Sequence, residues 1–97
     1  MAQIAWTNEA LRWLEDIFEY IAADNPDAAH RTVEGIFERV QSLAKYPGLG
    51  HRYLHSTRNV RILMYGHYRI AYLVTADGSV EILGVFHDAL DITKYQL

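Results

Sequence analysis

Two arginines and one histidine are the residues of this sequence best suited to chemistry. Arg61 and Arg69 lie in two apolar runs, and His87 ends a third run. Guanidinium and imidazole groups bind phosphates and transfer protons, so these three side chains on one surface would suit RNA cleavage. The same arginines would equally pair with carboxylates of a partner protein, or with Asp88 and Asp91. From the residue types alone we favour the pairing role.

Other catalytic or ligand-binding patterns are weak. His51, His55 and His67 have neither the spacing nor the nearby carboxylates of a closed metal site, so they are interpreted as ordinary loop histidines. The sequence contains no glycine-rich phosphate loop, no Ser/His/Asp order and no pair of catalytic carboxylates. We therefore expect no metal and no cofactor.

Length and composition indicate one domain. The chain has 97 residues, of which 51% are hydrophobic and 22% charged, which is typical of a globular protein with a single core. The absence of cysteine fits a reducing cytoplasm, and no apolar run approaches the length of a membrane span. The net charge of −3 argues against general nucleic-acid binding.

The charge is unevenly distributed along the chain. Residues 1–48 contain four Lys/Arg and eight Asp/Glu, whereas residues 49–97 contain five and four. Between Leu49 and Ala76 there are four arginines, three histidines and no acidic residue. The acidic first half and the basic middle therefore form different surfaces.

The first half of the chain predicts two helices. Thr7 is a suitable N-cap for an apolar stripe from Ala10 to Ala22, and a second stripe runs from Ala29 to Ala44. Between them, Asn25 and Pro26 combine a capping side chain with a proline at the first helical position. Because the link is short, the helices must pack antiparallel as a hairpin.

The second half predicts strands. Val60–Val74 reads as two strands around a turn at residues 65–67, and Val80–Phe86 reads as a third; residues 3–6 can add an edge strand. From His87 onward the pattern is irregular. The expected fold is α+β, with an N-terminal helical hairpin packed on a small antiparallel sheet of three to four strands.

Alternation along these strands predicts which side chains share a face. With a three-residue loop at residues 65–67, the face beneath the helices consists of Val60, Ile62, Met64, Tyr68, Ile70, Tyr72, Val74, Val80, Ile82, Gly84 and Phe86. A two-residue turn would bury Arg69 beside Ile62 and Met64, at a high cost, so the longer loop is preferred.

The opposite face is then half apolar and half cationic. We expect it to bind a partner through Arg61, Leu63, Arg69, Leu73, Leu83, Val85 and His87. The alternative is that the C-terminal segment, Leu90 to Leu97, folds back over this face. The two interpretations are compatible if a partner displaces or extends that segment.

The ordered set of motifs resembles the RelE/ParE superfamily of toxins from bacterial type II toxin–antitoxin systems. The matching segments are Trp6-Thr7, Ala10-Leu11, Tyr20-Ile21-Ala22, residues 25–29, residues 47–50, Val60-Arg61, residues 66–72 and residues 82–87. This resemblance covers nearly the whole chain and implies the same helical hairpin on an antiparallel sheet.

The resemblance also favours one branch. RelE-like members, which are ribosome-dependent endoribonucleases, carry basic residues seven and nine positions before the sheet arginine. Here that arginine is Arg69, and those positions hold Ile62 and Val60. An arginine eight positions before, Arg61, is usual in the ParE-like branch, whose members are understood to inhibit DNA gyrase. His87 and Tyr95 would match late RelE-type residues.

The resemblance therefore implies a ParE-like toxin that binds DNA gyrase and is neutralised by a cognate antitoxin, with which it would form a hetero-oligomer. No catalytic residue is favoured in this interpretation. Two alternatives stay open: an mRNA endoribonuclease using Arg69, His87 and Tyr95, and a module that has lost its toxicity.

Overall fold

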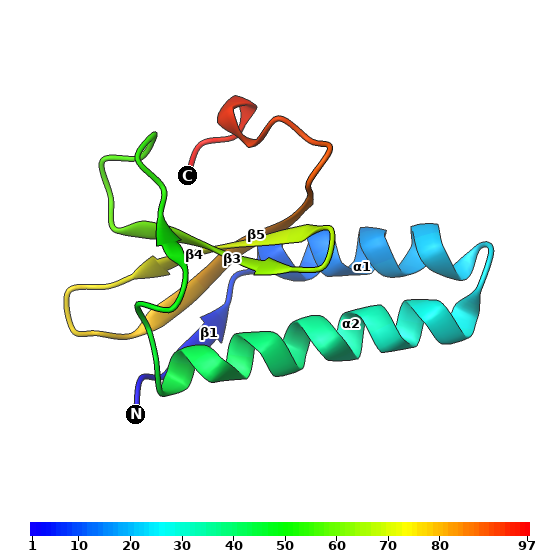
Figure 1. The fold of residues 1–97 in the computed structure, drawn as a ribbon, viewed down its shortest axis with the longest axis horizontal. Coiled ribbons are helices and arrows are strands. Elements are labelled where there is room, and N and C mark those ends of the chain that lie inside the picture. Colours follow the sequence, from blue (N-terminus) through cyan, green and yellow to red (C-terminus); the bar gives the residue numbers. More distant parts are fainter.

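The computed structural model describes residues 1–97 and shows two helices on one face of a five-stranded sheet (Figure 1). The strands are β1 (Ile4–Trp6), β2 (His51–Arg52), β3 (Val60–Tyr65), β4 (Tyr68–Val74) and β5 (Val80–His87). Their order is β1-β5-β4-β3-β2, with β1 parallel to β5 and the other neighbours antiparallel. The predicted α+β fold is confirmed. The sheet is larger than expected because the loop before β3 contributes β2.

The two helices begin at the predicted residues. α1 spans Asn8–Ala22 and α2 spans Pro26–Gln41, and the two run antiparallel (Figure 1). The Thr7 hydroxyl accepts a hydrogen bond from the Ala10 amide at 3.1 Å, and the Asn25 side chain accepts one from Ala28 at the same distance. Both caps satisfy amides that the first helical turn leaves without a partner. Neither helix is long and apolar enough to cross a membrane.

Two short 3₁₀ turns complete the chain. η1 (Ser42–Ala44) extends the end of α2, and η2 (Ile92–Lys94) lies in the segment after β5. The side chain of Asp91 accepts the Thr93 amide at the start of η2. The segment after β5 returns across the side of the sheet opposite the helices, where it meets the loop between β2 and β3 (Figure 1).

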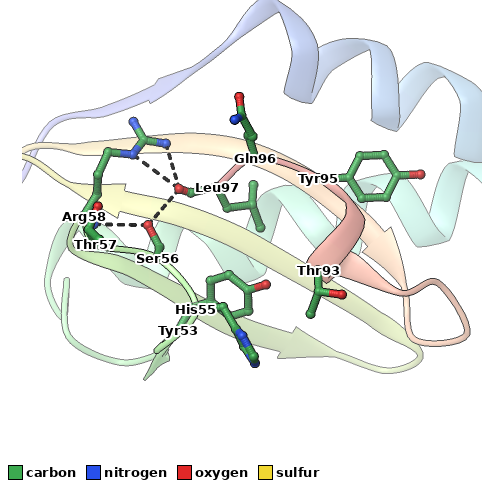
Figure 2. A pocket seen from close by; sticks show the side chains of 9 residues that line it. All are labelled: Tyr53, His55, Ser56, Thr57, Arg58, Thr93, Tyr95, Gln96 and Leu97. Atoms are coloured by element: carbon green, nitrogen blue, oxygen red, sulfur yellow. Dashed lines mark hydrogen bonds between the residues drawn. The ribbon is translucent and has the colours of Figure 1, made fainter.

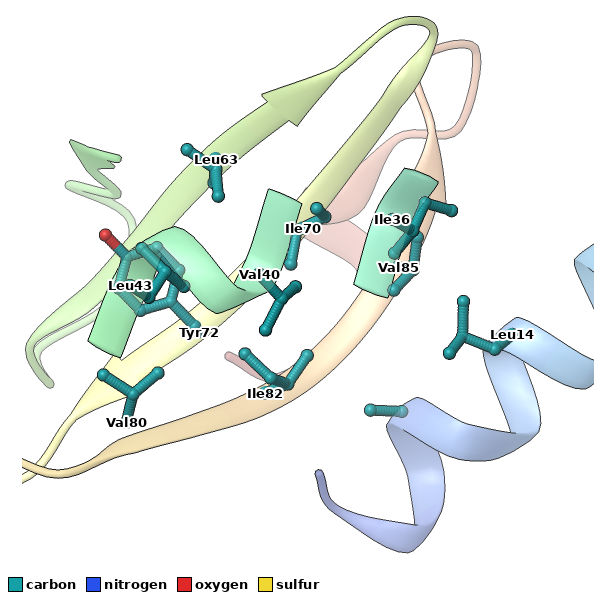
Figure 3. Close-up of a cluster of buried hydrophobic side chains, with 11 residues drawn as sticks. Leu14, Ile36, Val40, Leu43, Leu63, Ile70, Tyr72, Val80, Ile82 and Val85 are labelled. Atoms are coloured by element: carbon teal, nitrogen blue, oxygen red, sulfur yellow. The ribbon is translucent and has the colours of Figure 1, made fainter. Parts of the chain in front are cut away.

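The main core lies between the helices and the sheet (Figure 3). Its buried members are Ala10, Leu14, Ile36, Val40, Leu43, Leu63, Ile70, Tyr72, Val80, Ile82 and Val85. Two of them, Leu63 and Val85, were expected on the opposite face. The cause is the pairing register of the strands.

The turn between β3 and β4 contains two residues, so the predicted three-residue loop is wrong. Tyr65 pairs with Tyr68, which leaves Gly66 and His67 as the turn. Gly66 has a φ of +55°, a conformation that glycine adopts without steric cost. Because the side-chain period of a strand is two, this change of one residue moves the side chains of β3 to the other face.

A bulge in β5 causes the second difference. Ile82 pairs with Tyr72 and Gly84 with Ala71, so Leu83 is an extra residue in the ladder. Ile82 and Val85 therefore both face the helices, although a regular strand would point them to opposite sides. Phe86, predicted beneath the helices, faces away from them.

The second face of the sheet is covered by the chain itself. Its buried cluster consists of Tyr53, Val60, Ile62, Ala71, Phe86 and Ile92, with Trp13, Leu73, Leu83 and Leu97 packed against it. Tyr53 comes from the loop after β2, and Ile92 from the segment after β5. The prediction of a bare face is therefore wrong, and the alternative, a C-terminal segment folded back over the sheet, is confirmed.

Candidate functional site

Arg69 and Arg61 lie on opposite faces of the sheet. Arg69 on β4 is opposite Met64 and Phe86, on the face covered by the C-terminal segment. Arg61 on β3 is opposite Tyr72, which is fully buried on the helix side. The prediction that both arginines belong to one cationic face is wrong, because the two-residue turn fixes the other register.

Arg69 anchors the turn after β5. Its Nη2 donates to the carbonyl oxygens of Leu90, at 2.6 Å, and Asp88, at 3.2 Å, while its Nε is buried without a partner. Two main-chain oxygens thus replace the carboxylate partners that the sequence indicated. The guanidinium holds the C-terminal segment against the sheet.

Arg61 has the equivalent role on the other face. Its Nη1 donates to Gly50 O at 2.7 Å and to Gly48 O at 3.3 Å, in the loop before β2. The same loop is held by Tyr72, whose hydroxyl donates to Pro47 O at 2.7 Å and accepts from the Gly50 amide at 2.9 Å. Burial raises the pKa of Tyr72, an effect that the hydrogen bond to Gly50 and the charge of Arg61 oppose.

His87 lies on the helix side, at the end of β5 opposite Tyr68. The two rings are perpendicular, with centroids 5.5 Å apart. The carboxylate of Asp88 lies 3.2 Å from Nδ1 of His87 and 3.2 Å from Nδ1 of His67. Burial raises the pKa of Tyr68, and the nearby Tyr20 raises it further. This group forms a small polar cluster at the hairpin turn.

The three ribonuclease candidates do not form one site. Tyr95 packs its ring on Trp13 and Phe86, at centroid distances of 5.4 and 5.3 Å, on the face that carries Arg69. His87 is on the other face.

The four apolar residues predicted to bind a partner are likewise divided. Leu63 and Val85 are buried beneath the helices, at 2% and 0% exposure. Leu73 and Leu83 pack beneath the C-terminal segment.

Known proteins resemble this chain in sequence and in fold. The profile of the ParE toxin of type II toxin–antitoxin systems, parDE, matches residues 4–92. The chain belongs to the ParE toxin family. It is 44% identical to the Y4kP protein of Sinorhizobium fredii over 88% of this chain and 86% of that protein. It is 37% identical to toxin RelE2 of Caulobacter vibrioides over 92% of this chain and 98% of that protein.

Two solved structures share the fold. The chromosomal ParDE system of P. aeruginosa matches with a TM-score of 0.74 at 23% identity, covering 90% of this chain and 96% of that one. The RelBE2 toxin–antitoxin complex of Mycobacterium tuberculosis matches with a TM-score of 0.63 at 23% identity, covering 89% and 96%. The resemblance seen in the sequence is thereby confirmed, and this ParE-family chain is a type II toxin of the ParE/RelE superfamily.

Sequence reasoning missed an open pocket between the loop after β2 and the C-terminal segment (Figure 2). Its volume is about 600 Å³, and its lining residues are Tyr53, His55, Ser56, Thr57, Arg58, Thr93, Tyr95, Gln96 and Leu97. Ser56 Oγ donates to Leu97 O at 2.7 Å, and the Arg58 guanidinium lies 3.3 Å from the same oxygen. The one signal in the sequence was the acid-free stretch after Leu49.

No part of this ParE-family chain brings three or more His, Cys, Asp or Glu side chains together around a point that would hold a metal ion. The residues that line the pocket offer several hydroxyls, one imidazole and one guanidinium group instead. Such a set binds anions or carboxylates more readily than cations.

Proposed function

We propose that this ParE-family toxin inhibits DNA gyrase by binding to it, and that a cognate antitoxin neutralises it. The family match supports a toxin, and the separation of Arg69 from His87 supports binding over RNA cleavage. The placement of the two side chains on opposite faces of the sheet is the observation that carries this proposal.

The reason lies in the geometry of acid–base catalysis. A proton donor or acceptor must lie within about 3 Å of the atom that it serves, directly or through one water. Arg69 already donates to two carbonyl oxygens, and Nδ1 of His87 lies 3.1 Å from the Ala89 amide and 3.2 Å from Asp88. Both groups are therefore engaged by the segment after β5, which favours a binding role over acid–base catalysis.

The antitoxin would bind the helical hairpin. The two solved neighbours are toxin–antitoxin systems, and here the C-terminal segment already occupies the second face of the sheet. On the hairpin, Leu11 of α1 is 44% exposed and Phe37 of α2 is 37% exposed. Apolar side chains on a helical surface suit an amphipathic segment of a partner.

The test is a gyrase assay. Purified toxin is titrated into gyrase, ATP and relaxed plasmid, and the products are separated on an agarose gel. We expect loss of supercoiled product, or accumulation of cleaved DNA, at micromolar toxin. Addition of the antitoxin should restore supercoiling. Full supercoiling at every toxin concentration would refute the proposal.

The second candidate function is RelE-like cleavage of mRNA on the ribosome, which the similarity to toxin RelE2 favours. It predicts cuts in mRNA at the ribosomal A site in a purified translation system, and loss of these cuts in Arg69→Ala. Growth arrest on induced expression, measured in parallel, separates both activities from a chain without toxicity.

A further inference from the structure

The loop between β2 and β3 presents an aliphatic side chain to solvent. Leu54 is 85% exposed, whereas its neighbour Tyr53 is only 8% exposed and belongs to the buried cluster of the second face. An exposed leucine is ordinary by itself. Leu54 differs because its loop is held in place and carries basic side chains.

The loop is held in place on both sides of Leu54. The Tyr53 amide donates to Val60 O at 2.9 Å, and the Ser56 amide donates to Tyr53 O at 3.3 Å. Ser56 Oγ in turn accepts from the Arg58 amide at 3.1 Å and donates to Leu97 O (Figure 2). Because these bonds fix the loop in advance, little conformational entropy would be lost when Leu54 enters a pocket.

The stretch around Leu54 carries basic side chains and no carboxylate side chain. His51, Arg52 and His55 are exposed, and no acidic residue occurs between Leu49 and Ala76. Arg52 forms no side-chain hydrogen bond or ion pair within the chain, and it pairs across β2 and β3 with another arginine, Arg61. The charge of Arg52 is therefore available to an acidic partner.

We propose that this loop docks into an apolar pocket rimmed by carboxylates on the protein that the toxin inhibits. The inference rests on the proposed function and names the surface that performs it. Leu54 is the anchor, and Arg52 supplies the charge complementarity.

A protein fits this surface better than a nucleic acid. An aliphatic side chain does not bind a phosphate, and it does not stack on an unpaired base as an aromatic ring does, so Leu54 suits an apolar protein pocket better. The net charge of −3 also opposes binding to a polyanion. The loop lies on the side of the sheet away from the helices (Figure 1), so an antitoxin on the hairpin leaves it accessible.

The decisive experiment compares Leu54→Ala with the wild-type toxin in the gyrase assay. We expect the half-inhibitory concentration to rise about tenfold or more, as for the loss of a central anchor residue. Tyr46→Ala is the matched control: its side chain is 56% exposed and lies outside the loop, so its potency should stay at the wild-type value. Thermal melting and antitoxin binding show that each variant is folded.

A charge variant tests the expected carboxylates around the partner's pocket. Arg52→Glu should raise the half-inhibitory concentration, and added NaCl should weaken the wild-type toxin more than this variant. Growth arrest on induced expression gives a second measure that is independent of the target: Leu54→Ala should relieve the arrest and Tyr46→Ala should not.

The outcomes separate the two proposals. If the wild-type toxin has no effect on gyrase, the proposed function is refuted. The loop proposal is then tested by comparing growth arrest in cells that express the wild type or Leu54→Ala. Inhibition and arrest by Leu54→Ala at wild-type strength refute the loop and leave gyrase as the target. Binding of the toxin to plasmid without gyrase, equal in wild type and Leu54→Ala, would identify a nucleic acid as the partner and also overturn the loop proposal.

Discussion

Substitution of Gly35 by alanine sets two opposite effects against each other. Gly35 lies within α2, where alanine is favoured by about 1 kcal/mol through helix propensity. A Cβ at this position, however, would lie 1.8 Å from the hydroxyl of Tyr65 and 2.4 Å from its Cζ. The glycine thus permits α2 to approach β3 closely.

The clash should outweigh the gain in propensity. Tyr65 packs against the main core, so its ring has to shift within a filled space. Overpacking of this kind costs about 1–3 kcal/mol. Subtracting the propensity term of about 1 kcal/mol, we expect Gly35→Ala to lower the free energy of unfolding by about 1 kcal/mol.

A double-mutant cycle isolates the clash. In the Tyr65→Ala background the obstructing ring is absent, so Gly35→Ala should stabilise the protein by about 1 kcal/mol, giving a coupling of about 2 kcal/mol. Free energies come from urea unfolding at constant m-value. Gly48→Ala is the control, because a Cβ there meets nothing within 4 Å and should change stability little. Equal effects of Gly35→Ala in both backgrounds would refute the packing argument.

Three further predictions concern the two faces of the sheet. Tyr72→Phe leaves the Gly50 amide and the Pro47 carbonyl without their buried partner, which should cost about 1–3 kcal/mol in urea unfolding. Burial raises the pKa of Tyr72 above its ordinary value of 10.0, so the unfolded chain loses this proton at a lower pH than the folded chain. The free energy of unfolding should therefore be retained below about pH 10 and fall as the pH rises further. This fall should be less steep in Tyr72→Phe. Arg69→Lys keeps the charge but loses the paired bonds to the segment around Leu90, so amide exchange in η2 should accelerate while β4 and β5 stay protected. Unchanged exchange in η2 would show that Arg69 does not hold this segment.

The helices were predictable because their signals are local. Thr7 caps α1 and Asn25 caps α2 through amides three residues away, and Pro26 occupies the first helical position, as expected. Such contacts are settled by the nearest neighbours in the chain. The superfamily was predictable for a different reason, since its motifs are spread in order over the whole sequence.

The faces of the sheet were not predictable from alternation alone. One residue fewer in the turn after Tyr65 and one residue more at Leu83 change which side chains point to the helices. Neither feature has a strong local signal, because both faces of the sheet are apolar. Alternation distinguishes inside from outside only when one face meets water.

The assumed cost of placing Arg69 beside Ile62 and Met64 led to the wrong choice of turn. Arg69 is only half-buried, and its Nη2 donates to carbonyl oxygens of the segment after β5, whereas Arg61 on the other face donates to the loop before β2. Both arginines of the sheet are therefore occupied within the chain. The acid-free stretch also contains Arg52, which lies beside Leu54 and whose guanidinium has no partner within the chain. Within the second half of the chain, an acidic partner will therefore meet the charge of the loop before that of the sheet.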